Sequence, residues 1–386
     1  MRRLCLLVWL CFSTLVGKEA SLKREYATSC QEFTFSLYER LKEPEKNLLF
    51  SPYSIFTCIS MAYAGANGKT ATEIEKALSI TTERGYFFQI AETTNNELLK
   101  KVHIANGFWA DRDTFFLSAF RHLIEKNYQA QVESLDFQNR ERSTSIINEW
   151  TRNQTKGKIE TILAPDDINT STRLVLTNAI YFQDNWKQPF DPKLNREVLF
   201  KKSSSKSVFI PMMHMTQDCS YYEDELLQLI LLPLQEKNMA ALFFLPKTDS
   251  FLDKLVNQTA LNSYLDQIEN KSIAITLPKF SLKQRFYLKE TLISLGMKEA
   301  FSDHANFSLA NGMRDLFIDR VVHEALFTID ERGLLAAGST ASSLGLTSVP
   351  EQSSSTSFLA DHPFIFMLVD LENRIPLFIG KVHNPS

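Results

Sequence analysis

Two segments in the middle of the chain are apolar almost without interruption, and they restrict the possible folds more than any other feature. These segments, 227–233 and 239–246, have the length of β-strands and are far too short to span a membrane. A strand that is apolar on both faces needs cover on both faces, so we expect two central strands. Strand-like runs also occur at 173–182, 273–278, 325–330 and 364–369.

Helical patterns dominate the first third of the chain. Apolar side chains recur at helical spacing over 33–41, and Ser51-Pro52 is expected to begin a second helix, because proline is favoured in the first turn. We expect that helix to end near Gly65 and Gly68. Helices first and strands mostly afterwards, without a regular βαβ alternation, predict an α+β fold built on large sheets.

Charge and composition exclude several classes of protein. The 386 residues contain 42 basic and 45 acidic side chains, a formal net charge of -3, so no positive field indicates nucleic-acid binding. The chain is 44% hydrophobic with only 12 glycines and 13 prolines, which is typical of a packed protein and not of a linker. No internal boundary appears, so we expect a single domain.

The N-terminus has the pattern of a signal peptide. Two arginines precede a short apolar stretch within residues 1–17, and cleavage is expected there or as late as residue 20. We therefore expect a secreted, extracellular protein whose mature domain covers 21–386, with no membrane segment. Five N-glycosylation sequons are consistent with a glycoprotein; they begin at Asn153, Asn169, Asn257, Asn270 and Asn306.

Three cysteines remain after the predicted signal peptide. Cys30, Cys58 and Cys219 are an odd number, and their spacings match no zinc or disulfide framework. We expect buried or half-buried free thiols.

A long segment near the C-terminus is almost free of charge. From Gly333 to Ala360 only Glu351 is charged, and connections of this length inside a domain are usually functional or disordered. Alternate positions from Leu334 onward are mostly small and all uncharged: Leu334, Ala336, Gly338, Thr340 and Ser342. Such a segment could enter a sheet as a new central strand without burying a charge. Disorder is the alternative interpretation.

Motifs at five separated places connect the chain with a known family. They are NLLFSPYSI at 47–55, GANGKT at 65–70, TNAIYF at 177–182 followed by Trp186, TIDERG at 328–333 and PLFIGKVHNP at 376–385. Over essentially its full mature length the chain resembles the serpins, the serine protease inhibitors. The resemblance implies a metastable fold of three β-sheets, with a large central sheet A, eight or nine helices and an exposed reactive-centre loop.

The resemblance also implies a mechanism and a set of site residues. An inhibitory serpin is a suicide substrate: the target serine protease forms an acyl-enzyme with the loop, and the cleaved loop inserts into sheet A and traps the enzyme. The reactive bond falls between Thr347 and Ser348, with Leu346 as neighbour. The other implied groups are the hinge (Glu331, Gly333, Leu334, Leu335, Ala336, Ala337, Gly338, Ser339, Thr340), the shutter (Ser51, Ser54, Asn178, His323) and the breach (Trp186, Lys279, Glu331).

The hinge departs from the inhibitory pattern at one place. The family has a small residue and then glutamate where this chain has Leu334-Leu335, and insertion would turn Leu334 inward at an overpacking cost of ~1–3 kcal/mol. The small-residue run after it favours an inhibitor, and a non-inhibitory carrier or chaperone is the alternative. Thr347 predicts an elastase-like target; a shift by one residue would present Leu346 to a chymotrypsin-like enzyme.

Three other motifs are weak. Residues 65–70 lack the glycine spacing of a phosphate-binding loop, and His323-Glu324 lacks the second histidine of a zinc protease. Residues 338–341 lack the pattern of a hydrolase nucleophile. We expect no enzymatic activity, no metal and no cofactor.

The densest basic stretch consists of Lys193, Arg196, Lys201, Lys202 and Lys206. A solvated loop is its plain interpretation, and a site for a polyanion such as heparin is the alternative. We expect the chain to be a monomer. Its main expected partner is a serine protease held in a covalent complex.

Overall fold

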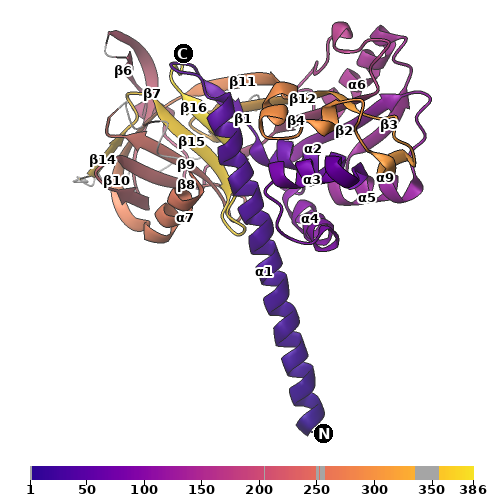
Figure 1. Cartoon of the computed structure of the whole chain (residues 1–386). Coiled ribbons are helices and arrows are strands. Elements are labelled where there is room, and N and C mark those ends of the chain that lie inside the picture. The colour runs from indigo at the N-terminus through magenta and orange to yellow at the C-terminus, as the bar shows by residue number, and fades with distance from the viewer. Residues whose placement is uncertain (1, 204, 249–251, 253–256, 335–355) are drawn as a thin grey trace.

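The computed structural model describes residues 2–203, 205–248, 252, 257–334 and 356–386, with side chains from residue 18 onward. Helix α1 (Arg2–Leu41) is continuous, and its N-terminal half extends away from the body of the molecule (Figure 1). The predicted signal-peptide boundary falls inside this helix and stays a prediction. None of the helices within the described residues is both long and apolar enough to span a membrane.

A seven-stranded sheet carries most of the residues predicted to be functional. Its order is β3-β2-β4-β12-β13-β5, and β11 pairs with the other edge of β12. β4 and β12 are parallel neighbours at its centre, and both run toward the end where β13 and β5 lie. The strands are β2 (His103–Asp111), β3 (Gln131–Leu135), β4 (Leu174–Tyr181), β5 (Asp184–Asn185), β11 (Phe280–Tyr287), β12 (Ile318–Ile329) and β13 (Gly333–Leu334).

The remaining strands form a nine-stranded sheet in the order β1-β16-β15-β9-β8-β7-β10-β14, with β6 paired to β7. The long strand β7 pairs with β6 at its start, with β10 in the middle and with β8 at its end. It therefore joins two parts of this sheet by continuous pairing, so the described strands form two hydrogen-bonded sheets where the resemblance implies three. The strands are β1 (Leu48–Phe50), β6 (Arg196–Ser203), β7 (Lys206–Glu223), β8 (Leu227–Pro233), β9 (Met239–Pro246), β10 (Glu269–Pro278), β14 (Thr356–Leu359), β15 (Phe364–Asp370) and β16 (Ile375–Val382).

Nine α-helices occur in the described residues. Besides α1 they are α2 (Pro52–Gly65), α3 (Gly68–Ala77), α4 (Arg84–Leu98), α5 (Ser118–Tyr128), α6 (Arg140–Gln154), α7 (Gln258–Gln267), α8 (Lys289–Ser294) and α9 (Ser308–Asn311). Helix α2 begins as predicted at Ser51-Pro52, where the Ser51 hydroxyl accepts a hydrogen bond from the Ser54 amide. It is buried along its whole length and lies against β4, β2 and β16.

The two faces of the seven-stranded sheet have different cover. Alternate residues of β4, such as Leu176 and Ile180, belong to the main hydrophobic core on the α2 side. The residues between them, such as Val175 and Ala179, pack in a second cluster with Ile147 of α6. The seven-stranded sheet therefore lies between α2 and α6, and its central strands are buried on both faces.

Most of the predicted strands are confirmed. β8 and β9, the two apolar runs, lie inside the nine-stranded sheet and are covered on both sides. The predicted strand at 325–330 is only the last part of β12, which begins at Ile318.

The cysteine prediction is confirmed as well. Cys30, Cys58 and Cys219 are buried free thiols, and burial raises the pKa of Cys58 to about 12.

The solvated-loop interpretation of the basic stretch is wrong. Except for Lys193, its residues lie in the β6–β7 hairpin, because Val198 and Phe200 pair with Ile210 and Val208 and give the hairpin an apolar inner face.

Candidate functional site

The chain after β12 turns back and enters the seven-stranded sheet as β13. Leu334 pairs with Ile329 of β12 on one side and with Asp184 of β5 on the other, and its side chain is fully buried. A Cβ atom at Gly333 would lie 2.1 Å from the backbone oxygen of Asp184, so no side chain fits at this position without displacing the backbone. The first two residues of the long uncharged segment are therefore already part of the sheet.

Beyond β13 the sheet is closed. β4 and β12 pair directly from Leu174 opposite Ile318 to Tyr181 opposite Leu326. A further strand between them would have to replace these hydrogen bonds and move the two strands apart by about 5 Å. If the residues after β13 continued as a strand, they would run between β12 and β4. We call this line between the two strands the path, and β13 lies at its beginning.

A buried polar cluster crosses the middle of this path on the α2 side. His323 of β12 lies opposite Asn178 of β4, and its Nδ1 is 2.5 Å from the Asn178 Oδ1. The Nε2 of His323 accepts a hydrogen bond of 3.0 Å from the amide of Ser51. The Nδ2 of Asn178 donates to the Ser54 hydroxyl at 2.6 Å. The four residues predicted to form the shutter are therefore in one hydrogen-bonded group.

The hydrogen bonds determine the protonation of His323. Because Nε2 accepts from a backbone amide, Nδ1 carries the proton and donates to Asn178. The ring is completely buried, and this burial lowers the pKa of His323 to about 3. The imidazole is therefore neutral at physiological pH.

Two further residues extend this cluster and were not predicted from the sequence. Asn106 of β2 accepts a hydrogen bond of 2.6 Å from the Asn178 Nδ2 and donates to the Thr57 hydroxyl of α2. Both side chains are buried. A polar asparagine between Ala105 and Gly107 in the strand-like run 103–111 was the available signal.

The three residues predicted to form the breach meet at the turn between β12 and β13. The Lys279 ammonium lies 2.8 Å from the Glu331 carboxylate, and the Asn195 amide also donates to that carboxylate. Burial raises the pKa of Glu331, but these two hydrogen bonds outweigh it and leave the pKa below its usual value. The indole of Trp186 donates to the Asp330 carbonyl at 2.9 Å, and its backbone amide donates to Arg332.

The structure thus brings together the predicted residues at the start of the path and those at its middle, together with Gly333 and Leu334 of the hinge. The other predicted residues lie outside the described part of the chain. They are Leu335, Ala336, Ala337, Gly338, Ser339 and Thr340 of the hinge and Leu346, Thr347 and Ser348 at the reactive bond.

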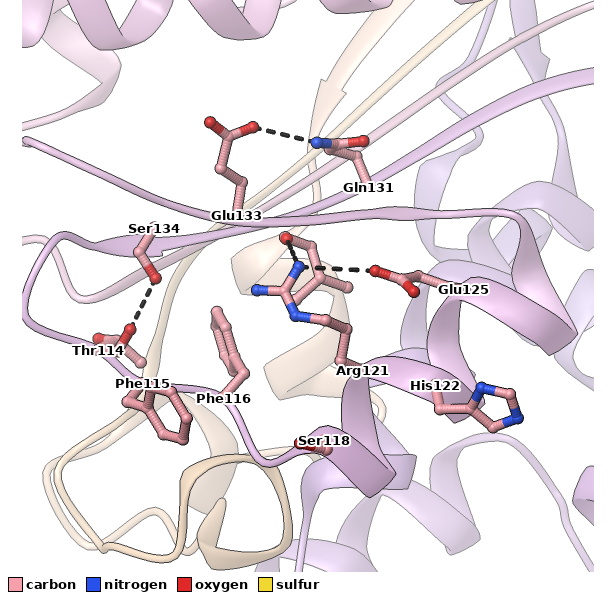
Figure 2. Close-up of a pocket in the computed structure, with 11 residues that line it drawn as sticks. Thr114, Phe115, Phe116, Ser118, Arg121, His122, Glu125, Gln131, Glu133 and Ser134 are labelled. Atoms are coloured by element: carbon pink, nitrogen blue, oxygen red, sulfur yellow. Dashed lines mark hydrogen bonds and ion pairs between the residues drawn. The ribbon is translucent and has the colours of Figure 1, made fainter.

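A polar groove between α5 and β3 is a second concave surface near the sheet (Figure 2). The guanidinium of Arg121 donates to the Val132 carbonyl at 2.6 Å and pairs with Glu125 at 3.5 Å. Ser134 donates to the backbone of Thr114, and the ring of His122 points away from these groups. The charged residues Arg121 and Glu125 are paired with each other, and no hydrogen bond joins a nucleophile to a base among the residues that line the groove.

Comparisons with known proteins agree with the fold and the motifs. A family model described as Serpin (serine protease inhibitor) matches residues 28–385. Intracellular coagulation inhibitor 2 of Tachypleus tridentatus is 31% identical over 98% of this chain and 97% of its own length. Human alpha-1-antichymotrypsin is 31% identical over 93% of this chain and 88% of its own. The structure of human thyroxine-binding globulin superposes with a TM-score of 0.85 at 26% identity and covers 95% of this chain and 100% of that one.

These matches place the chain in a class of proteins described as serine protease inhibitors. The chain belongs to the serpin family. The family is described as serine protease inhibitors and its members are not enzymes, so the chain has no enzymatic activity of its own.

Proposed function

We propose that the chain is an inhibitory serpin that traps serine proteases by inserting its cleaved loop between β4 and β12. The observation that carries this proposal is β13: Gly333 and Leu334 already lie in the sheet between β12 and β5, while β4 and β12 are still paired. The loop therefore needs no new entry point and has only to extend an existing strand.

The steps follow from the chemistry of the protease and the length of the loop. The serine of the protease attacks the reactive bond and forms an ester with the new C-terminus of the loop. A strand from Gly333 to Thr347 at ~3.3 Å per residue covers roughly 50 Å, so insertion carries the attached enzyme along the sheet. Distortion of the enzyme there prevents hydrolysis of the ester.

The hydrogen bonds of the cluster around His323 oppose insertion. A strand that separates β4 from β12 breaks the hydrogen bond between His323 and Asn178. Ser51 caps the N-terminus of α2 and Ser54 lies in its first turn, outside the sheet, so their short side chains can form hydrogen bonds before and after the strands move. Glu331 and Lys279 keep the turn at β13 in place while the sheet opens.

The unusual leucine at the start of the hinge supports insertion. Leu334 is already completely buried in the intact chain, in the position between β12 and β5 that an inserted strand requires. Any overpacking by this side chain is therefore present before cleavage and adds no barrier when the loop inserts.

The proposed target is an elastase-like or chymotrypsin-like serine protease. A threonine before the reactive bond, Thr347, fits a small specificity pocket, and Leu346 fits a larger apolar one. Similarity to alpha-1-antichymotrypsin favours the second of these enzymes. No basic residue lies between Arg332 and His362, so trypsin-like enzymes are expected to be poor targets.

A carrier is the second candidate function. The similarity to thyroxine-binding globulin and the leucine pair at 334–335 favour it. A carrier or a chaperone would be cleaved by proteases without forming a complex.

The proposed setting is extracellular. The apolar N-terminal stretch supports secretion, and four of the five sequon asparagines are exposed, which supports glycosylation. The exposed ones are Asn153, Asn169, Asn257 and Asn270.

Incubation with elastase-like, chymotrypsin-like and trypsin-like proteases tests the proposal. We expect a complex that survives SDS and a released peptide beginning at Ser348. Cleavage by every enzyme without a complex would replace the inhibitor with the carrier or chaperone.

Two loop variants provide a matched pair for this experiment. Because Leu334 faces inward, the alternation of a strand turns Thr340 inward as well. Thr340→Arg would bury a charge on insertion and is expected to be cleaved without a complex, while Thr340→Ser, which keeps a small uncharged side chain at the same position, should still form one.

A further inference from the structure

The segment after α6 lies across the seven-stranded sheet, on the face opposite α2. At one side α6 packs on β2, where Trp150 meets Trp109 edge to face with 5.3 Å between the ring centres. At the other side Arg285 of β11 donates to the carbonyl of Thr161. β4 and β12 lie between β2 and β11 in the sheet. Residues 157–163, which we call the crossing segment, therefore pass over the line where β4 and β12 meet.

The crossing segment is joined firmly to α6. The side chain of Asn148 in α6 accepts hydrogen bonds from the amides of Ile162 and Leu163, both at 2.9 Å, and donates to the Leu163 carbonyl at 2.8 Å. The apolar side chains of the segment share one cluster with Ala179 of β4 and Val322 of β12. The segment and α6 therefore form one packed unit, and side chains that reach it from β11 tie this unit to the far side of the path.

Arg285 makes such a tie through a buried carboxylate. Its Nε donates to Glu324 at 2.6 Å, while its Nη2 donates to the Thr161 carbonyl. Glu324 points to the α6 side of the sheet, as does Val322 two residues before it, and 1% of the Glu324 side chain is exposed. The guanidinium thus bridges the middle of β12 and the crossing segment.

Two further ties lie farther along the path. The hydroxyl of Tyr287 donates to the Asp167 carboxylate at 3.2 Å, and Nε of Arg320 donates to the Asp167 carbonyl at 2.5 Å. Arg320 precedes Glu324 on β12, and β13 joins the opposite, C-terminal end of that strand. A strand that grows from β13 therefore reaches Arg285, which pairs with Glu324 in the register, before it reaches these ties.

Insertion of a strand would pull Arg285 away from the crossing segment. The new strand moves β12 and β11 about 5 Å away from β4 and β2. A hydrogen bond does not survive a displacement of that size. If α6 stays packed on β2, the bond between Arg285 and Thr161 is lost as the strand reaches Glu324.

We propose that Arg285 sets the rate at which the sheet opens between β4 and β12, because it ties the crossing segment to β11. This inference rests on the proposed inhibitory function and adds a positioning residue that determines its rate. Arginine suits this role, since its planar fork donates from two nitrogens at once, one to the buried carboxylate and one to a backbone carbonyl.

Three variants separate the tie from the charge balance at Glu324. Arg285→Lys keeps a positive charge beside the buried carboxylate, but a single ammonium cannot occupy both donor positions. Arg285→Met removes the charge and the tie. Lys283→Met is the matched control, because Lys283 of the same strand also pairs with Glu324, at 3.1 Å, and forms no hydrogen bond to the crossing segment among the described residues. Thermal unfolding of each variant measures the effect on overall stability.

Hydrogen exchange in the uncleaved chain measures opening of the sheet without any protease. We expect the paired amides of β4 and β12 to exchange about tenfold faster in both Arg285 variants, because a hydrogen bond from a charged donor is lost. Lys283→Met should exchange there like the wild type, and the amides of β8 and β9 should not change in either Arg285 variant. Equal exchange of β4 and β12 in all chains would overturn the inference, and so would an increase of the same size in β8 and β9.

The rate of protease inactivation at saturating chain concentration measures insertion itself. We expect this rate to rise about tenfold in Arg285→Lys and to stay unchanged in Lys283→Met. A purely structural role would lower the melting temperature of the Arg285 variants without raising this rate. Inactivation at the wild-type rate by both Arg285 variants would overturn this inference alone. Cleavage without inactivation in every chain, together with faster exchange of β4 and β12 in the Arg285 variants, would exclude the inhibitor and keep the role of Arg285 in holding the sheet closed.

Discussion

Replacement of His323 by glutamine should remove a large part of the pH dependence of stability. Glutamine can accept from the Ser51 amide and donate to Asn178 as the imidazole does, but it does not titrate. In the wild type, burial lowers the pKa of His323 to about 3, while the unfolded chain has the ordinary value of 6.5. Below pH 6.5 the unfolded state therefore binds a proton that the folded state excludes, and stability falls as pH falls. Between pH 7 and pH 5 this loss is about 2 kcal/mol.

Urea unfolding at these two pH values measures the effect. Between pH 7 and pH 5 we expect the free energy of unfolding to fall by about 2 kcal/mol more in the wild type than in His323→Gln. His304→Gln is the control, because the His304 side chain is exposed, and it should follow the wild type. Equal losses for the wild type and His323→Gln would refute the assignment of a buried, neutral imidazole at the centre of the sheet.

Three other substitutions test the start of the path and the cluster at its middle. Gly333→Val should displace β13 and lower the stability by ~1–3 kcal/mol in thermal unfolding, because its Cβ would collide with the Asp184 carbonyl; an unchanged melting temperature would contradict this. Lys279→Met should lower the free energy of unfolding by at most ~1 kcal/mol at pH 7, since Glu331 is only partly buried. Because pairing lowers the pKa of this carboxylate, the difference should disappear as pH falls below its folded pKa; a constant difference down to pH 2 would argue against the ion pair. Asn106→Ala should lower the free energy of unfolding by ~1–3 kcal/mol, measured by urea unfolding, and should promote polymerisation, which native gels detect. Wild-type stability without polymers would exclude a role for β2 in the cluster.

The central strands were predictable from the sequence because burial on both faces leaves a continuous apolar run. β8 and β9 show this directly. The polar cluster was harder to predict, since one asparagine or histidine in such a run has no periodic signature. The family resemblance indicated Asn178 and His323, whereas it indicated no residue of β2, and Asn106 was missed.

The hairpin and β13 were missed for different physical reasons. Lysines and serines made the stretch 193–206 look like a loop, although Val198 and Phe200 alternate with exposed residues in the pattern of a half-buried strand. β13 is only two residues long, and whether such a short segment pairs depends on the room between β12 and β5. That room depends on tertiary packing and leaves no pattern in the local sequence.

The melting temperature before and after cleavage within 341–347 tests most directly whether the loop can become a strand of the central sheet. Insertion would add a strand of about 13 residues to the two of β13, and at ~1 kcal/mol for each new hydrogen bond the melting temperature of a chain this size should rise by about 10 °C or more. Thr340→Arg, cleaved at the same place, should show a much smaller rise. A cleaved wild-type chain that melts at the temperature of the intact one would contradict insertion between β4 and β12.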